Sequence, residues 1–133
     1  MPNPSLFRCG SGVVYLQCCA PFHTGDKLAP TAEALMRSRF SAYCLHNAAY
    51  LLATWDARTR PMTLSFAGDQ PCWQSLDIVR TQQGRTKDSK GKVEFNAFYT
   101  EGGQRWCLNE RSRFVKAGGR WFYVDGVVSC FLK

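Results

Sequence analysis

The chain has 133 residues, of which 45% are hydrophobic and 20% are charged. This length suits one domain with its own hydrophobic core, and an aromatic content of 14% excludes a disordered chain. A net charge of +7 at pH 7 favours anionic partners such as nucleic acid, although it does not bear on the fold.

The composition also argues against a membrane or secreted location. No apolar run approaches the ~18 residues of a membrane span, and residues 1–8 lack the apolar core of a signal peptide. We therefore expect a cytoplasmic chain with no membrane partner. In that compartment, clustered cysteines indicate metal binding rather than disulfides. Four cysteines stand alone, and we expect each to be a small buried side chain: Cys44, Cys72, Cys107 and Cys130.

The first 29 residues are rich in glycine, proline and cysteine and show no clear period. Within them, Cys9 precedes a Gly-Ser-Gly turn, and Cys18 and Cys19 follow it. Thiolates suit zinc, which takes four ligands in a tetrahedron. Glycines after a ligand cysteine let the backbone turn tightly and direct N–H groups at the sulfur. The segment is therefore a candidate zinc knuckle.

Two helices are predicted after the knuckle. Residues 30–46 place Met36, Phe40 and Tyr43 on one stripe, as in an amphipathic helix, and Thr31 suits its N-cap. Residues 48–55 have the pattern of a second, shorter helix. The following segment, up to residue 72, contains two prolines and a glycine and is predicted to be mostly loop.

The pattern then changes from helical to alternating. Alternation predicts four strands, over residues 73–81, 92–100, 104–115 and 120–125. Glycine pairs at 102–103 and 118–119 predict tight turns, so the strands joined by them should run antiparallel. Helices followed by an antiparallel meander indicate an α+β fold, with the helices on one face of a curved sheet.

The third predicted strand places a carboxylate among apolar side chains. One face of it is shared by Trp106, Leu108, Glu110, Ser112 and Phe114. A buried carboxylate must be paired or neutralised, so we favour an ion pair between Glu110 and an arginine of the first helix. The alternative is a pocket in which Glu110 acts as a general base or ligand anchor. The pocket candidates are Glu110, Arg37, Arg39 and Trp121.

Several motifs together carry a family resemblance. Residues 9–19 resemble a SEC-C motif, and residues 31–43, 110–115 and 119–126 resemble the YchJ family, in the same order. The resemblance covers nearly the whole chain. It implies a SEC-C knuckle over residues 1–29 and a cone-shaped α+β domain like nuclear transport factor 2 (NTF2) over residues 30–133.

The knuckle departs from the SEC-C pattern at its first ligand. Cys9, Cys18 and Cys19 match three of the four ligand positions. Phe7 occupies the remaining position, which is the first in the motif, and His23 is the nearest replacement. The resemblance thus implies zinc as the cofactor, while the alternative is a decayed knuckle held by apolar packing.

Three functions remain open. The first is an interaction module, because the SEC-C motif resembles the tail of the SecA translocation ATPase and implies a protein or ribosomal partner. The second is a small-molecule binder or acid–base enzyme that uses the cone cavity around Glu110; whether the chain is an enzyme stays undecided. The third is nucleic-acid binding through a basic sheet face and its neighbouring loop. The candidate basic residues are Arg85, Lys87, Arg105, Arg111 and Arg113.

Overall fold

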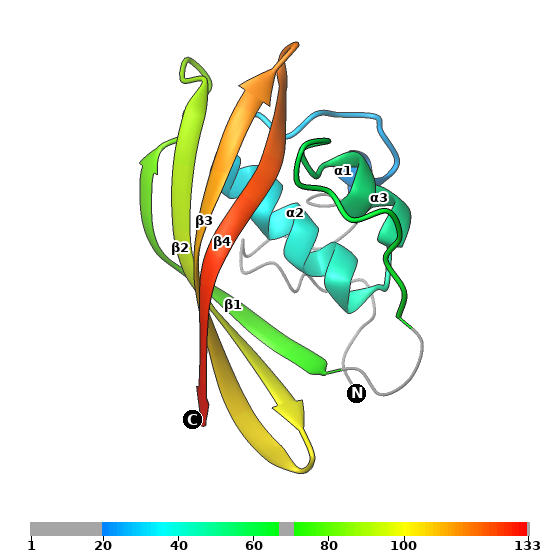
Figure 1. The fold of residues 1–133 in the computed structure, drawn as a ribbon, viewed down its shortest axis with the longest axis vertical. Coiled ribbons are helices and arrows are strands. Elements are labelled where there is room, and N and C mark those ends of the chain that lie inside the picture. The colour runs from blue at the N-terminus through cyan, green and yellow to red at the C-terminus, as the bar shows by residue number, and fades with distance from the viewer. Residues whose placement is uncertain (1–19, 67–70, 133) are drawn as a thin grey trace.

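A computed structural model describes residues 20–66 and 71–132 as three helices and one four-stranded sheet (Figure 1). The predicted α+β class is confirmed. Figure 1 shows the helices on one side of the sheet, with the β2–β3 hairpin and the end of β4 extending beyond them. Within the described ranges, no helix is long and apolar enough to cross a membrane.

Three helices precede the sheet: α1 (Ala20–His23), α2 (Ala32–Cys44) and α3 (Ala48–Ala53). Thr31 caps α2 as predicted, because its Oγ1 accepts a hydrogen bond from the Ala34 amide at 3.0 Å. The Asn47 side chain caps α3 in the same way, from the Tyr50 amide at 3.1 Å. Sequence patterns missed α1, because one turn is too short to show a helical period.

The sheet is an antiparallel meander in the order β1-β2-β3-β4. Its strands are β1 (Cys72–Gln83), β2 (Lys90–Glu101), β3 (Gln104–Ala117) and β4 (Arg120–Leu132). The predicted turns at Gly102-Gly103 and Gly118-Gly119 have positive φ at all four glycines, which suits tight hairpins. The β4 strand continues to Leu132, well beyond the predicted end at residue 125.

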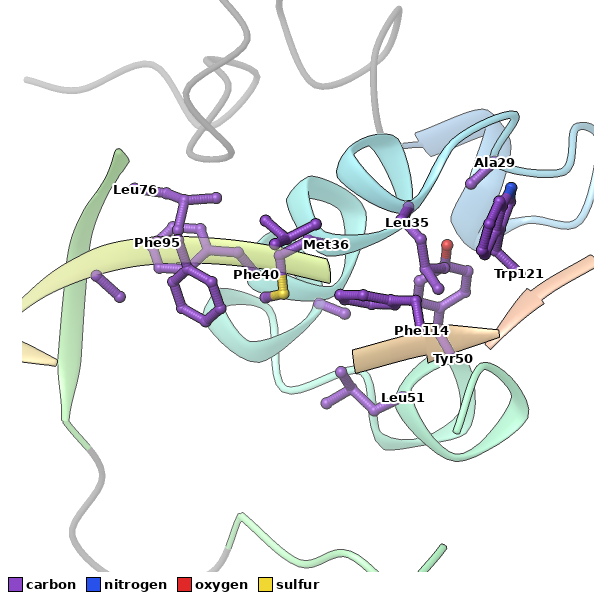
Figure 2. Packing of buried hydrophobic residues seen from close by; sticks show 14 residues of the cluster. Ala29, Leu35, Met36, Phe40, Tyr50, Leu51, Leu76, Phe95, Phe114 and Trp121 are labelled. Carbon is purple, nitrogen blue, oxygen red and sulfur yellow. The ribbon is translucent and has the colours of Figure 1, made fainter. Parts of the chain in front are cut away.

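The core lies between the helices and the sheet (Figure 2). The predicted stripe of α2 is inside, with Met36 and Phe40 at most 5% exposed, and it packs on buried residues of the strands such as Phe95 and Phe114. In Figure 2, Phe95 lies at one end of this cluster and Trp121 at the other. The expected burial of the single cysteines is wrong for Cys72 and Cys130, which are exposed, and correct for Cys107.

Candidate functional site

Arg39 is the only buried charged residue of the described chain, with 1% of its surface exposed. It projects from α2, and its Nη1 donates hydrogen bonds to the Leu51 carbonyl at 2.8 Å and to Thr54 Oγ1 at 2.7 Å. The guanidinium also lies over the rings of Trp55 and Tyr123, at 5.0 and 4.6 Å from their centroids. Burial lowers the pKa of Arg39, and these ring contacts and hydrogen bonds offset the cost of burying its charge.

Glu110 of β3 forms the second charged group of the site. Its Oε2 accepts hydrogen bonds from Ser112 Oγ at 2.7 Å and from the Tyr123 hydroxyl at 2.8 Å. Gly126 of β4 makes room for this carboxylate, because a Cβ at that position would lie 2.8 Å from Glu110 Cδ. Among the described residues, no hydrogen bond reaches the other carboxylate oxygen, Oε1.

Two tyrosines stand beside these charges. Burial raises the pKa of Tyr123, and the negative charge of Glu110 raises it further. Burial also raises the pKa of Tyr43, which the positive charge of Arg39 partly opposes. Both phenols therefore stay protonated at neutral pH and can donate hydrogen bonds.

A hollow of about 220 Å³ opens between α2 and the sheet, with Arg39 and Glu110 both in its wall. The remaining lining is mostly apolar and aromatic and comes from α2 and all four strands. It consists of Met36, Phe40, Tyr43, Trp73, Phe95, Ala97, Leu108 and Tyr123. Larger hollows of about 320, 590 and 670 Å³ exist, but their linings include exposed cations such as Arg120, Lys92 and Arg113, and no buried charged side chain.

The structure brings together two of the four pocket candidates. Arg39 and Glu110 line the same hollow, whereas Arg37 forms an ion pair with Glu33 at 3.0 Å. Trp121 lies elsewhere in the core, where its indole N–H donates to the Pro30 carbonyl at 3.2 Å. The ion pair that we favoured for Glu110 is not among the salt bridges of the described residues. The Arg39 guanidinium is instead held by hydrogen bonds to Leu51 and Thr54 and by the two rings that it lies over. The Glu110 carboxylate accepts hydrogen bonds from the hydroxyl groups of Ser112 and Tyr123.

The candidate basic residues do not form one cluster. Arg113 is paired with Asp125, with Nε 2.6 Å from Oδ1, and Arg85 with Asp88 at 3.0 Å. Arg111 stands opposite Glu94 in the strand register. Arg105 lies opposite Thr100, next to the turn of the β2–β3 hairpin. Lys87 is exposed in the loop between β1 and β2. Acidic neighbours thus offset part of the positive charge of this face.

The three knuckle cysteines lie outside the described residues, so zinc binding stays a prediction. Within the described ranges, no group of three or more His, Cys, Asp or Glu side chains could hold a metal. His23 is described, and its Nε2 lies 2.8 Å from the Ser38 carbonyl oxygen. Because a carbonyl can only accept, Nε2 carries the proton in this contact.

Sequence reasoning missed several residues of the site. Thr54, Trp55 and Tyr123 build the surroundings of Arg39, and Tyr123 also binds Glu110. Alternation along β4 puts Tyr123 on the same face as Trp121, but nothing in the sequence indicated that its hydroxyl would meet Glu110 or its ring Arg39. Tyr43 was predicted to be buried, but nothing in the sequence indicated that it would meet a charge.

A curved antiparallel sheet with helices over one face and a hollow beneath them defines the NTF2-like class of α+β domains. The family model described as "YchJ, middle NTF2-like domain" matches residues 31–126. A UPF0225 protein from Streptomyces avermitilis is 46% identical over 125 residues, which cover 94% of this chain and 86% of that protein. Another from Ralstonia nicotianae is 49% identical over 130 residues, covering 89% and 88%. The chain therefore belongs to the YchJ family.

Two solved structures are similar to the whole architecture. A SEC-C motif containing protein from Rhodopseudomonas palustris superposes with a TM-score of 0.78 at 34% identity, covering 90% of this chain and 95% of that one. A second SEC-C motif containing protein, from Psychrobacter arcticus, gives a TM-score of 0.73 at 27% identity, covering 98% and 81%. Both support the predicted NTF2-like fold.

Proposed function

We propose that the hollow between α2 and the sheet binds a small, mostly apolar molecule that donates a hydrogen bond to Glu110. The observation that carries this proposal is the arrangement of the Glu110 carboxylate. Its two hydrogen bonds, from Ser112 and Tyr123, both end on Oε2. Glu110 is only partly buried, and Oε1 takes no hydrogen bond from the described residues, so Oε1 can accept one from a ligand that enters the largely apolar hollow.

The size of the hollow limits the ligand. A volume of about 220 Å³ is below the ~300–1,000 Å³ of drug-sized sites. It corresponds to about seven water volumes, or on the order of ten non-hydrogen atoms. The aromatic lining from Phe40, Trp73 and Phe95 suits a ring or a short branched chain. We therefore expect a single-ring or similarly small molecule.

The charges limit the ligand further. Arg39 and Glu110 carry opposite charges in one wall, so a neutral molecule matches the site better than a strong anion or cation. A hydroxyl or amine group provides the donor for Glu110. The other polar lining groups are two tyrosines with raised pKa values, and neither is a base at neutral pH. Glu110 thus has no second proton-exchanging group beside it among the lining residues, and we propose binding rather than acid–base catalysis.

A substitution at Glu110 tests the proposal without removing its neighbours. In Glu110→Gln, the amide oxygen can still accept from Ser112 and Tyr123, while an NH₂ donor replaces Oε1. We expect small hydroxyl- or amine-bearing fragments to raise the melting temperature of the wild type and to bind by calorimetry. Affinity should fall by about 10- to 100-fold in Glu110→Gln, the loss expected for a hydrogen bond to a charged group.

A matched control is Glu94→Gln, which changes a partly exposed carboxylate on the opposite face of the sheet. This variant should bind the same fragments as the wild type. Fragments that bind Glu110→Gln and the wild type equally well would refute the proposed role of Glu110. No binding by any fragment of suitable size would refute the pocket itself.

We also propose docking through a zinc knuckle as a second function, with Cys9, Cys18, Cys19 and His23 as ligands. The supporting observation is the contact of His23 Nε2 with the Ser38 carbonyl, since metal-binding histidines usually donate their other N–H in this way. Zinc would hold the knuckle in a fixed shape that a protein or ribosomal partner could recognise. Elemental analysis should find about one zinc per chain in the wild type and none in Cys18→Ser/Cys19→Ser; an absence of zinc from the wild type would reject this proposal.

A further inference from the structure

The two edges of the sheet differ in how they are protected. Exposed edge strands invite pairing with other strands unless bulges, charges or coverage prevent it. The β1 edge has two register shifts, next to Trp73 and Ile78, and carries Asp77 and Arg80. These features make β1 a poor template for another strand.

The first half of the β4 edge is covered by the segment after α3. The Tyr123 amide donates to the Thr54 carbonyl at 2.8 Å, and the Asp56 amide donates to the Tyr123 carbonyl at 2.7 Å. Thr59 Oγ1 also donates to the Val124 carbonyl at 2.7 Å. Beyond Asp125, no described strand lies along this edge, since β4 pairs only with β3.

The uncovered part of the edge, Gly126–Leu132, contains no charged residue. Its large apolar side chains are well exposed on both faces. Val127 and Phe131, on the face away from the helices, are 68% and 51% exposed, and Val128 and Leu132, on the other face, are 50% and 55% exposed. Soluble chains rarely leave such an edge without a partner.

We propose that Gly126–Leu132 pairs antiparallel with the same segment of a second copy, so that two sheets join into one of eight strands. The segment is self-complementary about Ser129. A twofold axis there sets Val127 opposite Phe131 of the second copy on one face, and Val128 opposite Cys130 of the second copy on the other. Exposed apolar side chains thus cover one another on both faces.

Charge favours a second copy at this place over other contacts between copies. Each chain carries a net charge of +7, so two copies repel one another over most of their surfaces. The segment itself carries no charge; beside it, β3 places Arg111 opposite Val127 and Glu110 opposite Val128, and Asp125 is paired with Arg113, so charges of both signs flank this edge. This inference does not depend on the proposed ligand site.

Sedimentation equilibrium of the wild type tests the pairing. One chain has a mass of 15.0 kDa, and we expect a dimer with twice that mass at micromolar concentrations. In Val127→Lys/Phe131→Lys, the introduced charges should give a monomer with an unchanged circular dichroism spectrum. The matched control is Val79→Lys, which places a lysine at a 48% exposed valine of the opposite edge strand and should leave the dimer intact.

A cross-link tests the register. Ser129→Cys in a Cys72→Ser/Cys130→Ser background should form a disulfide-linked dimer when oxidised with diamide, whereas Cys72→Ser/Cys130→Ser alone should not. A monomeric wild type would overturn the proposal, because the edge would then be covered by something other than a second copy of the chain. A dimer that persists in Val127→Lys/Phe131→Lys would also overturn it, because the contact would then lie elsewhere.

Discussion

Replacing Gly126 by alanine disturbs the Glu110 site with a single methyl group. The new Cβ would lie 2.8 Å from both Cγ and Cδ of Glu110, which is closer than carbon atoms can pack. The glutamate side chain is flexible, so it can move away without a shift of the backbone. In moving, it would leave the hydroxyl groups of Ser112 and Tyr123, which now lie 2.7 and 2.8 Å from its Oε2.

The cost follows from these two hydrogen bonds. Ser112 is 1% exposed, so its hydroxyl would stay buried without its acceptor, at about 1–3 kcal/mol. Alanine recovers about 0.5–1 kcal/mol relative to glycine within a strand. We therefore expect Gly126→Ala to lower the free energy of unfolding by up to about 2.5 kcal/mol. The displaced carboxylate should also abolish ligand binding in the hollow.

Urea unfolding of a double-mutant cycle measures this effect. In Glu110→Ala the obstructing side chain is absent, so Gly126→Ala should cost nothing or should stabilise the chain slightly. The urea midpoint should move while the slope of the transition stays constant. The reasoning fails if Gly126→Ala costs the same in both backgrounds, because the cost would then not arise from Glu110.

Three further substitutions test other parts of the account. Arg39→Met should cost about 3 kcal/mol in urea unfolding, because the Leu51 carbonyl and Thr54 lose a buried donor. Arg58→Met, at an exposed ion pair, should leave the urea midpoint nearly unchanged, and equal effects of the two substitutions would contradict the buried role of Arg39. Thr31→Ala should cost about 1 kcal/mol through loss of the α2 cap, and a neutral result would show that the cap is dispensable. Because burial raises the pKa of Tyr123 above its usual 10.0, the stability that its protonated form contributes is complete below pH 10 and is lost as the pH rises further. Tyr123→Phe should therefore lose less stability than the wild type between pH 9 and pH 11, and identical alkaline profiles would contradict the raised pKa.

Much of the fold could be predicted because its signals are local. The cap at Thr31, the stripe through Met36 and Phe40, and the glycine pairs of the hairpins each act within a few residues. The alternation along β3 also assigned Glu110 correctly to the helix-facing side, where it lines the hollow. The length of β4 was missed because its last residues are exposed and apolar on both faces, so they show no alternation.

The partners of Glu110 could not be predicted, because they depend on geometry between distant segments. Opposite charges on α2 and β3 favour an ion pair in any argument from sequence alone. The structure instead holds Arg39 through a carbonyl, a threonine and two rings, which come from α3, the residues just after it and β4. Tyr123 reaches Glu110 from the adjacent strand, with its hydroxyl donating to Oε2 at 2.8 Å, and no local sequence pattern indicates that contact.

The most direct test of the pocket is methyl NMR of the methionines while a small hydroxyl- or amine-bearing fragment is added. Met36 lines the hollow and is 5% exposed, whereas Met62 is 98% exposed and serves as an internal control. Binding in the hollow predicts a saturable shift of the Met36 methyl signal, no shift of Met62, and loss of the Met36 shift in Glu110→Gln. A Met36 signal that stays fixed while a fragment binds, or that shifts equally in Glu110→Gln, would contradict the proposed function.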